Sequence, residues 1–149
     1  MERMGFGWLL GSVLVVFLFI GCSGTRPPNL GVKDNRLSPC PSSPNCVSSQ
    51  SDDGGPKIDP IRFTSTLAEA MARLKEVVQG KERTTVVRET PEYFHVEFRT
   101  VLGFVDDVEF FADESQKVIH LRSASRVGYW DLGVNRRRIE SIRAEFGRK

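Results

Sequence analysis

The residues best suited to chemistry lie in one stretch, Arg122 to Arg138, which reads RSASRVGYWDLGVNRRR. Planar guanidinium groups bind carboxylates and phosphates through paired hydrogen bonds. Three interpretations stay open: a structural ion pair with the other arginines solvated, an anion-binding pocket of Arg126, the three final arginines and the serines, or a hydrolytic site. The candidate ligand-binding or polar cluster comprises Asp106, Asp107, Arg122, Ser123, Ser125, Arg126, Asp131, Asn135, Arg136, Arg137 and Arg138.

A hydrolytic site would need a base within hydrogen-bond reach of a serine. The expected strand register turns His120 away from Ser123 and Ser125, and the sequence has neither a G-x-S-x-G elbow nor a Gly-rich phosphate loop. We therefore assign no catalytic residue. His95 and His120 with a nearby glutamate could hold a metal, but a histidine on an antiparallel sheet face is usually just solvated. Neither a metal nor a cofactor is predicted.

A strand leads into the arginine-rich stretch and a helix leads out of it. Residue patterns predict strands at Arg83 to Glu89, Tyr93 to Arg99, Phe104 to Phe111 and Val118 to Ser125. Thr66 and Glu69 form a capping box that opens one helix, and Gly80 ends it. A second helix begins at Val134 or Asn135. The predicted fold is α+β: a four-stranded antiparallel meander with two helices packed on one face, preceded by an extended, disulfide-bearing N-terminal segment.

The alternation of apolar and polar residues in the second strand predicts a sheet that is solvated on one side. A hairpin that turns between Glu114 and Ser115 would pair Asp106 with Ser123 on the apolar side. A carboxylate covered by helices must be paired, because burying it alone costs several kcal/mol. On the other side, this register pairs Glu109 with His120 and Asp107 with Arg122.

Three consecutive arginines, Arg136 to Arg138, occupy the first turn of the second predicted helix. The helix dipole disfavours cations there by about 0.3 to 1 kcal/mol each. A negative group is therefore expected close to them. Asp106, Asp131 or an anionic ligand could supply it.

Residues 1–21 have the pattern of a lipoprotein-type signal peptide, with an apolar run over 6–20. Its end resembles the bacterial lipobox, in which the cysteine, here Cys22, is lipidated and becomes the mature N-terminus. The alternatives are an uncleaved N-terminal anchor and ordinary cleavage that leaves a free thiol. Ser23 after the cysteine resembles outer-membrane rather than inner-membrane sorting. We expect a tether over 22–36 and one domain over 37–149 that faces the periplasm from the cell envelope.

Charge is distributed in two blocks. Residues 92–114 hold seven acids and one base, whereas residues 115–149 hold nine bases and three acids. We expect the blocks to neutralise each other inside the fold. The net charge of +2 is too small for a nucleic-acid partner. The predicted partners are the membrane, through lipidated Cys22, and a small anionic ligand or an envelope protein.

Cys40 and Cys46 lie six positions apart in an exported chain, which predicts a disulfide worth about 2 kcal/mol. A redox dithiol and half of a metal site are the alternatives, but the spacing is not C-x-x-C. Tyr129 and Trp130, in a glycine-flanked turn, could form an aromatic rim for a ligand or cap the edge of the core.

Three segments carry a resemblance to a known family: CPSSPNCVSS from Cys40, FVDDVEF from Phe104, and RSASRVGYWDLGVNRRRI from Arg122. They resemble the domain-of-unknown-function family 1499, over Leu37 to Phe146. The resemblance implies a bacterial chain, often exported or lipid-anchored, with no agreed activity. It also implies that the two cysteines and the polar cluster matter, without giving any of them a catalytic role.

The leading hypothesis is a lipid-anchored cell-envelope protein with a non-catalytic binding or structural domain. Its polar cluster would hold an anionic ligand or a partner. The alternative is a secreted or periplasmic hydrolase that uses the same cluster.

Overall fold

The computed structural model describes residues 23–148, so the predicted signal peptide and Cys22 lie outside the described residues. Within that range no helix has the length and apolar character needed to cross a membrane. Two helices are present where the sequence places them, α1 Leu67–Gln79 and α2 Val134–Phe146. The Thr66–Glu69 capping box is formed and Gly80 is the C-cap of α1.

The main sheet has six strands, so the predicted four-stranded meander is wrong, although the α+β class is confirmed. The four expected strands are β5 Thr84–Glu89, β6 Tyr93–Arg99, β7 Val105–Asp113 and β8 Val118–Ser125. The two extra strands are β3 Cys46–Ser48 and β4 Ile61–Arg62, which both pair antiparallel with β8. A separate two-stranded ribbon joins β1 Val32–Lys33 and β2 Arg36–Leu37.

The extra strands escaped prediction because they are too short to show a period of two. They lie in a segment rich in proline, glycine and serine, and they form because the outer edge of β8 offers unpaired backbone groups. Cys46 pairs with Ala124 and Ile61 pairs with Ile119. The predicted disulfide is confirmed: Cys40 and Cys46 are bonded, with their Cα atoms 5.7 Å apart, and the closed loop leads directly into β3.

The register of the β7–β8 hairpin differs by two residues from the predicted one. Asp106 pairs with Ser125 and Glu109 pairs with Arg122. The turn is centred between Ser115 and Gln116, one residue later than expected, because Asp113 pairs with Val118. Within it Lys117 adopts a positive φ of 54° and the Asp113 carboxylate accepts a hydrogen bond from the Gln116 amide at 3.1 Å. A shift of two residues leaves every side chain on its predicted face of the sheet.

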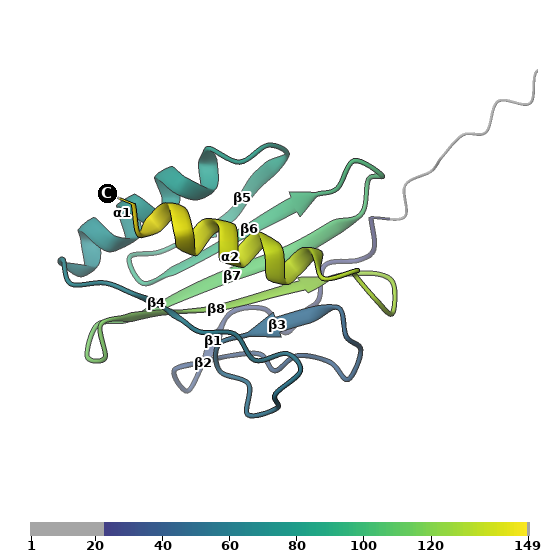
Figure 1. Cartoon of the computed structure of the whole chain (residues 1–149), viewed down its shortest axis with the longest axis horizontal. Helices are drawn as coiled ribbons and strands as arrows, with labels where there is room; N and C mark the ends of the chain where they lie inside the picture. Colours follow the sequence, from purple (N-terminus) through teal and green to yellow (C-terminus); the bar gives the residue numbers. More distant parts are fainter. Residues whose placement is uncertain (1–22, 149) are drawn as a thin grey trace, which may run out of the picture.

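Both helices cover the same face of the sheet (Figure 1) and bury its apolar side chains there. The largest completely buried groups come from strands and helices alike: Phe94, Phe110, Leu74, Ile119, Leu121, Ile139 and Ile142. At about 25 cal/mol per Å² of apolar surface, this layer supplies most of the driving force for folding.

The other face of the sheet is buried as well, so the prediction of a sheet that is solvated on one side is wrong. Residues 23–45 run across it, and Leu37 forms a small apolar cluster with Tyr93 and Phe111. Beneath this segment the sheet buries ionisable side chains whose exposed fractions are 5% or less: His95, Asp107, Glu109 and Arg122. The sheet therefore separates an apolar layer from a polar one.

Candidate functional site

The predicted polar cluster is divided between the two faces of the sheet. On the α2 side lie Asp106, Ser123, Asp131, Asn135 and Arg138; on the side covered by the N-terminal segment lie Asp107, Arg122 and Arg126. Successive residues of a strand point to opposite faces, and this alternation separates neighbours in sequence. The two groups therefore form two different sites.

On the α2 side, Arg138 forms an ion pair with a buried carboxylate near the start of β7. Its Nη2 donates to Asp106 Oδ2 at 2.5 Å, and the guanidinium lies 4.7 Å from the centre of the Phe98 ring. Asp106 is only 2% exposed. The sequence prediction that a guanidinium further along the chain pairs with this carboxylate is confirmed.

Asn135 joins three parts of the chain on the same side. Its Oδ1 accepts from Ser123 Oγ at 2.5 Å and from Arg138 Nη1 at 2.7 Å, while its Nδ2 donates to Asn45 O at 3.1 Å and to Ser125 Oγ at 3.0 Å. The amide has no exposed surface. These bonds hold β8, α2 and the disulfide loop together, which is a structural role.

At the start of α2, the Asp131 side chain caps backbone amides that have no partner within the helix. Asp131 Oδ2 accepts from the Asn135 amide at 2.8 Å, and Oδ1 accepts from the Gly133 amide at 2.9 Å.

The other two arginines of the run bind backbone carbonyls. Arg136 Nη2 donates to the carbonyls of Gly55 and Lys57, both at 2.9 Å, and Arg137 Nη1 donates to Leu132 O at 2.8 Å. The three arginines diverge from one another and from Arg126, so they do not form the pocket considered from sequence.

On the opposite face, Arg126 binds two carboxylates. Its Nε donates to Asp107 Oδ2 at 2.7 Å and its Nη2 to Asp107 Oδ1 at 2.8 Å, and it also binds Glu97. Arg26 from the N-terminal segment binds the same Glu97 oxygen through Nε at 3.0 Å. His95 Nε2 lies 2.8 Å from Asp107 Oδ1. This side of the sheet therefore carries a continuous charge network.

The electrostatics of the network follow from these contacts. Burial alone would raise the pKa of Asp107, but hydrogen bonds from Arg126 and His95 and the charge of Arg126 lower it to about 2. Glu97 behaves alike: burial would raise its pKa, and hydrogen bonds from Arg26 and Arg126 lower it. The bond to Asp107 raises the pKa of Arg126. Both acids are ionised at neutral pH, so the charge of Arg126 is balanced by two carboxylates.

Glu109 and Arg122 are the exception to this close pairing. Glu109 has no exposed surface, and its Oε1 accepts from the Tyr93 hydroxyl and the Gly31 amide, each at 2.7 Å. Burial and the hydrogen bond to Glu109 raise the pKa of Tyr93, so it stays a neutral donor. The contact from Arg122 Nη1 to Glu109 Oε2 is long, at 3.4 Å. Neutral donors therefore satisfy Oε1 of Glu109, and the long contact from Arg122 is the bond to Oε2.

Arg122 in consequence keeps unused donors. Its side chain is 6% exposed, and its buried Nε has no hydrogen-bond partner within residues 23–148. A guanidinium has five N–H donors. Buried polar groups are nearly always satisfied, so the unpaired Nε leaves the Arg122 guanidinium incompletely satisfied by the described residues.

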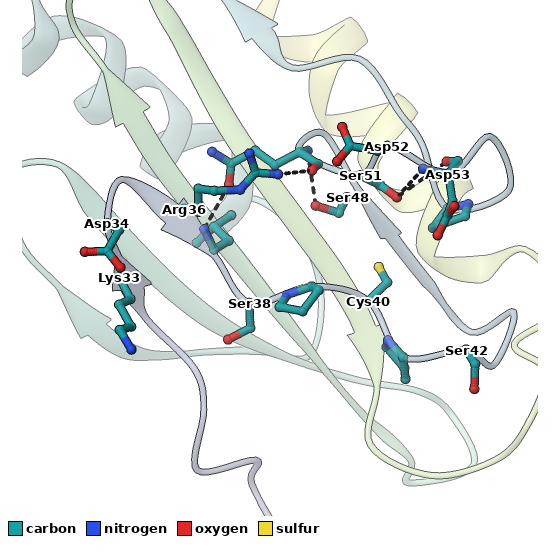
Figure 2. Close-up of a pocket in the computed structure, with 15 residues that line it drawn as sticks. Lys33, Asp34, Arg36, Ser38, Cys40, Ser42, Ser48, Ser51, Asp52 and Asp53 are labelled. Carbon is teal, nitrogen blue, oxygen red and sulfur yellow. Dashed lines mark hydrogen bonds between the residues drawn. The ribbon is translucent and has the colours of Figure 1, made fainter.

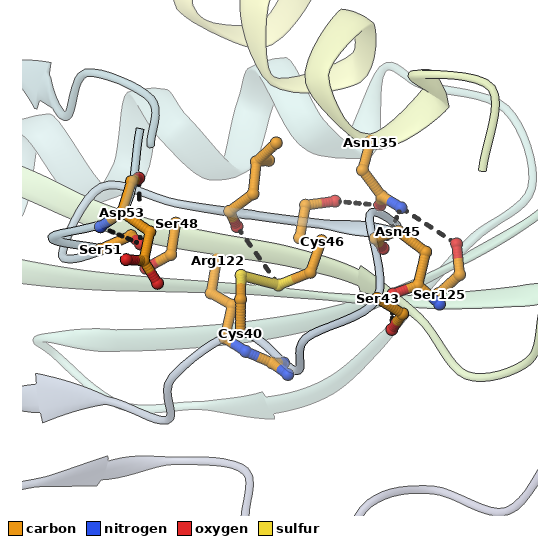
Figure 3. Close-up of a disulfide and its surroundings, with 12 residues drawn as sticks. Cys40, Ser43, Asn45, Cys46, Ser48, Ser51, Asp53, Arg122, Ser125 and Asn135 are labelled. Carbon is orange, nitrogen blue, oxygen red and sulfur yellow. Dashed lines mark hydrogen bonds between the residues drawn. A yellow bond between two sulfur atoms is a disulfide. The ribbon is translucent and has the colours of Figure 1, made fainter. Parts of the chain in front are cut away.

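A cavity of about 390 Å³ adjoins this guanidinium. Proline and cysteine side chains of the N-terminal segment form its outer wall, and the sheet forms its floor. Figure 3 shows the Arg122 side chain beside Cys40, below the disulfide. The lining residues are Pro27, Asn29, Pro39, Cys40, Pro41, Asp107, Arg122, Ala124, Ser125 and Arg126. Its volume is at the lower end of the range for small-ligand pockets.

A larger hollow of about 690 Å³ lies between the β1–β2 ribbon and the disulfide loop (Figure 2). The charged side chains at it, among them Lys33, Asp34 and Arg36, are exposed. Arg36 Nη2 donates to Gln50 O at 2.7 Å, and the Gln50 side chain accepts from the Leu37 amide at 2.8 Å. These bonds tie the ribbon to the domain and leave no buried charge aimed into the hollow, so we favour the smaller cavity.

No hydrolytic arrangement is formed by the predicted residues. Ser123 and Ser125 bind Asn135, and His120 lies on the other face, as predicted from the alternation of β8. His120 Nδ1 is instead 3.3 Å from Ser49 Oγ, a hydroxyl that also accepts from the Leu121 amide. Residues 23–148 contain no group of three or more histidine, cysteine, aspartate or glutamate side chains that could hold a metal ion.

Sequence reasoning included Asp107 in the polar cluster but left out the acceptors Glu97 and Glu109 and the donors Tyr93 and Arg26. One signal was available: Tyr93, His95 and Glu97 alternate on β6 opposite Asp107 and Glu109, which is a dense set of ionisable groups for one face. The long extended segment at the N-terminus was the element able to cover them. Tyr129 and Trp130, with exposed fractions of 75% and 66%, cap no part of the core.

The fold and the two polar sites define a small α+β domain in which a disulfide-bearing segment covers one face of an antiparallel sheet. Residues 36–146 match the family model described as "Protein of unknown function (DUF1499)", and the chain belongs to this family. The search of curated proteins and the search of solved structures each gave no match.

Proposed function

We propose that this chain is a lipid-anchored cell-envelope protein whose domain binds a small anionic ligand without turning it over. The domain would face the periplasm, from the outer rather than the inner membrane. The observation that carries the binding proposal is the incompletely paired guanidinium of Arg122, whose Nε has no hydrogen-bond partner among residues 23–148, at the wall of the 390 Å³ cavity.

The neighbours of Arg122 define the ligand class. Asp107 and Glu97 bind Arg126 closely, whereas Arg122 has one long contact with Glu109 and an Nε without a hydrogen-bond partner among residues 23–148. A carboxylate or phosphate group matches its planar fork, because two parallel N–H···O bonds can form. The proline side chains on the outer wall suit a small apolar body attached to that group.

Thermal unfolding with added anions tests the proposal. Sulfate or phosphate should raise the melting temperature above that in chloride at equal ionic strength, because a ligand that binds only the folded state stabilises it. The gain is about 2.7 kcal/mol when the free ligand reaches 100 times its Kd.

The decisive variant is R122Q combined with E109Q, which removes both charges and leaves no buried carboxylate without a cation. It should lose the sulfate and phosphate effect. R136Q is the matched control. Arg136 does not line this cavity and binds the backbone carbonyls of Gly55 and Lys57, so R136Q should keep the sulfate and phosphate effect. Equal anion stabilisation in all three proteins would refute the assignment to Arg122.

The anchor needs a separate measurement. Mass spectrometry of the mature N-terminus should find Cys22 as the first residue, with added acyl and glyceryl mass. A retained leader or an unmodified Cys22 would contradict the lipid anchor and leave the binding proposal intact.

A further inference from the structure

Two loops expose apolar and aromatic side chains. They are the β6–β7 hairpin, residues 100–104, and the β8–α2 loop, residues 126–133. Within the described chain, six of the eight exposed large hydrophobic residues belong to these loops. Their exposed fractions are 82% for Val101, 77% for Leu102, 40% for Phe104, 75% for Tyr129, 66% for Trp130 and 62% for Leu132. Such grouping, unlike scattered single residues, marks an interaction surface.

The two loops leave the sheet at the same end. Asp106 pairs with Ser125 across the β7–β8 ladder, and the Arg126 amide donates to Val105 O at 3.1 Å just beyond it. Figure 1 shows the β6–β7 hairpin and the β8–α2 loop at the same end of the domain. We call the six exposed residues of these loops the apolar end.

The described chain begins at this end as well. Gly24 packs so closely on the β8–α2 loop that a Cβ built on it would lie 2.8 Å from Val127 Cγ1 and 2.9 Å from Arg126 Cβ. An extended residue spans at most about 3.5 Å, so Cys22 cannot be more than about 7 Å from Gly24. A lipid anchor on Cys22 would therefore hold the apolar end close to the bilayer.

The chemistry of the loops suits the boundary between lipid and water. Tryptophan and tyrosine prefer the headgroup level, where the ring is buried and the polar atom stays hydrated. An exposed arginine of a neighbouring element binds the backbone of each loop: Arg99 Nη1 at the end of β6 donates to Gly103 O at 3.1 Å, and Arg137 Nη1 in the first turn of α2 donates to Leu132 O at 2.8 Å. These cations would lie beside anionic headgroups.

We propose that the apolar end docks on the surface of the membrane that holds the anchor, with its six side chains inserted at headgroup level. This inference rests on the proposed anchoring. It gives the domain a fixed orientation, in which the β7–β8 hairpin at the other end of the sheet points away from the bilayer.

Tryptophan fluorescence tests this orientation directly, because Trp8 and Trp130 are the only two tryptophans in the chain. The W8F full-length chain, purified from bacterial membranes, would be reconstituted into vesicles of phosphatidylethanolamine and phosphatidylglycerol. Emission from Trp130 should shift to shorter wavelength, be quenched by lipids brominated near the headgroup, and lose its quenching by aqueous iodide.

The matched control moves the probe to the opposite end. W8F/W130F/S115W places the only tryptophan on the exposed β7–β8 turn, and its emission should be quenched by iodide and not by brominated lipid. If the protein floats with the vesicles but iodide still quenches Trp130, docking is overturned while the anchor stands. If the protein fails to float, both proposals fall. Shielding of Trp130 that grows with protein concentration without vesicles would assign the surface to a second copy and overturn docking.

Discussion

Asp106 and Asp107 are adjacent in the chain, yet their carboxylates bind arginines on opposite faces of the sheet. Asp106 pairs with Arg138 of α2, and Asp107 pairs with Arg126 beneath the N-terminal segment. One β7 dipeptide thus fixes the closing helix on one side and anchors the charge network on the other. The two pairs can be tested separately.

The Asp106–Arg138 pair should be strongly coupled. D106N leaves a guanidinium that is largely buried without its anion, and we expect a loss of about 3 kcal/mol in the free energy of unfolding. R138Q should cost a similar amount, and the double variant less than the sum, which urea denaturation will measure as a coupling energy. E140Q on the same helix removes an exposed pair with Arg143 and should change stability by less than about 1 kcal/mol. Strict additivity of D106N and R138Q would argue against the pair.

Asp107 should make stability depend on acid pH. Its folded-state pKa of about 2 lies below the ordinary value of 3.8, so the unfolded chain binds the proton more readily. The stabilisation, about 2 kcal/mol, is complete above about pH 5 and is lost as the pH falls through 3.8 towards 2.

Unfolding free energies measured between pH 2 and 5 will test this sign. The D107N variant should have a flatter pH profile than the wild type in that window. D52N, which changes an exposed aspartate, should keep the wild-type profile. Parallel profiles for wild type and D107N would mean that this carboxylate does not carry the effect.

Gly24 should be needed for the N-terminal segment to lie on the sheet. Its φ is +66°, and a methyl group would collide with Val127 and Arg126. We expect G24A to weaken docking of the segment by about 1 kcal/mol or more. The readout is hydrogen exchange of the Gly31 amide, which is bound to buried Glu109 and should exchange about fivefold faster. G54A is the control, since nothing lies within 4 Å of a Cβ at Gly54.

The sequence predicted the elements whose signals are local. The Thr66–Glu69 box, the strand alternation from Tyr93 to Arg99 and the start of α2 each depend on residues close together in the chain, and each is found in the structure. The Cys40–Cys46 bond belongs to the same group, because the loop is short. The prediction that a buried acid on β7 meets an arginine of the last helix also held, because strand parity survives an even shift in register.

The sequence did not predict the pairing of β3 and β4 with β8 or the segment that covers the polar face, because both depend on residues far apart in the chain. β3 and β4 exist only because the edge of β8 pairs with them, and no period within three residues could reveal that. The face carrying His95, Asp107 and Glu109 has the alternation of a solvated sheet, and it is buried because residues 23–45 happen to cross it.

The sequence by itself determined the helices, the core strands, the disulfide and the face on which each side chain lies, because these depend on chain geometry over a few residues. The tertiary structure alone decided how closely each arginine of the polar face is paired. Arg126 binds Asp107 and Glu97 at short distance, whereas Arg122 makes one long contact with Glu109, whose other oxygen binds Tyr93 and Gly31 from two other segments. Long-range packing sets that competition for one carboxylate, and no local pattern encodes it.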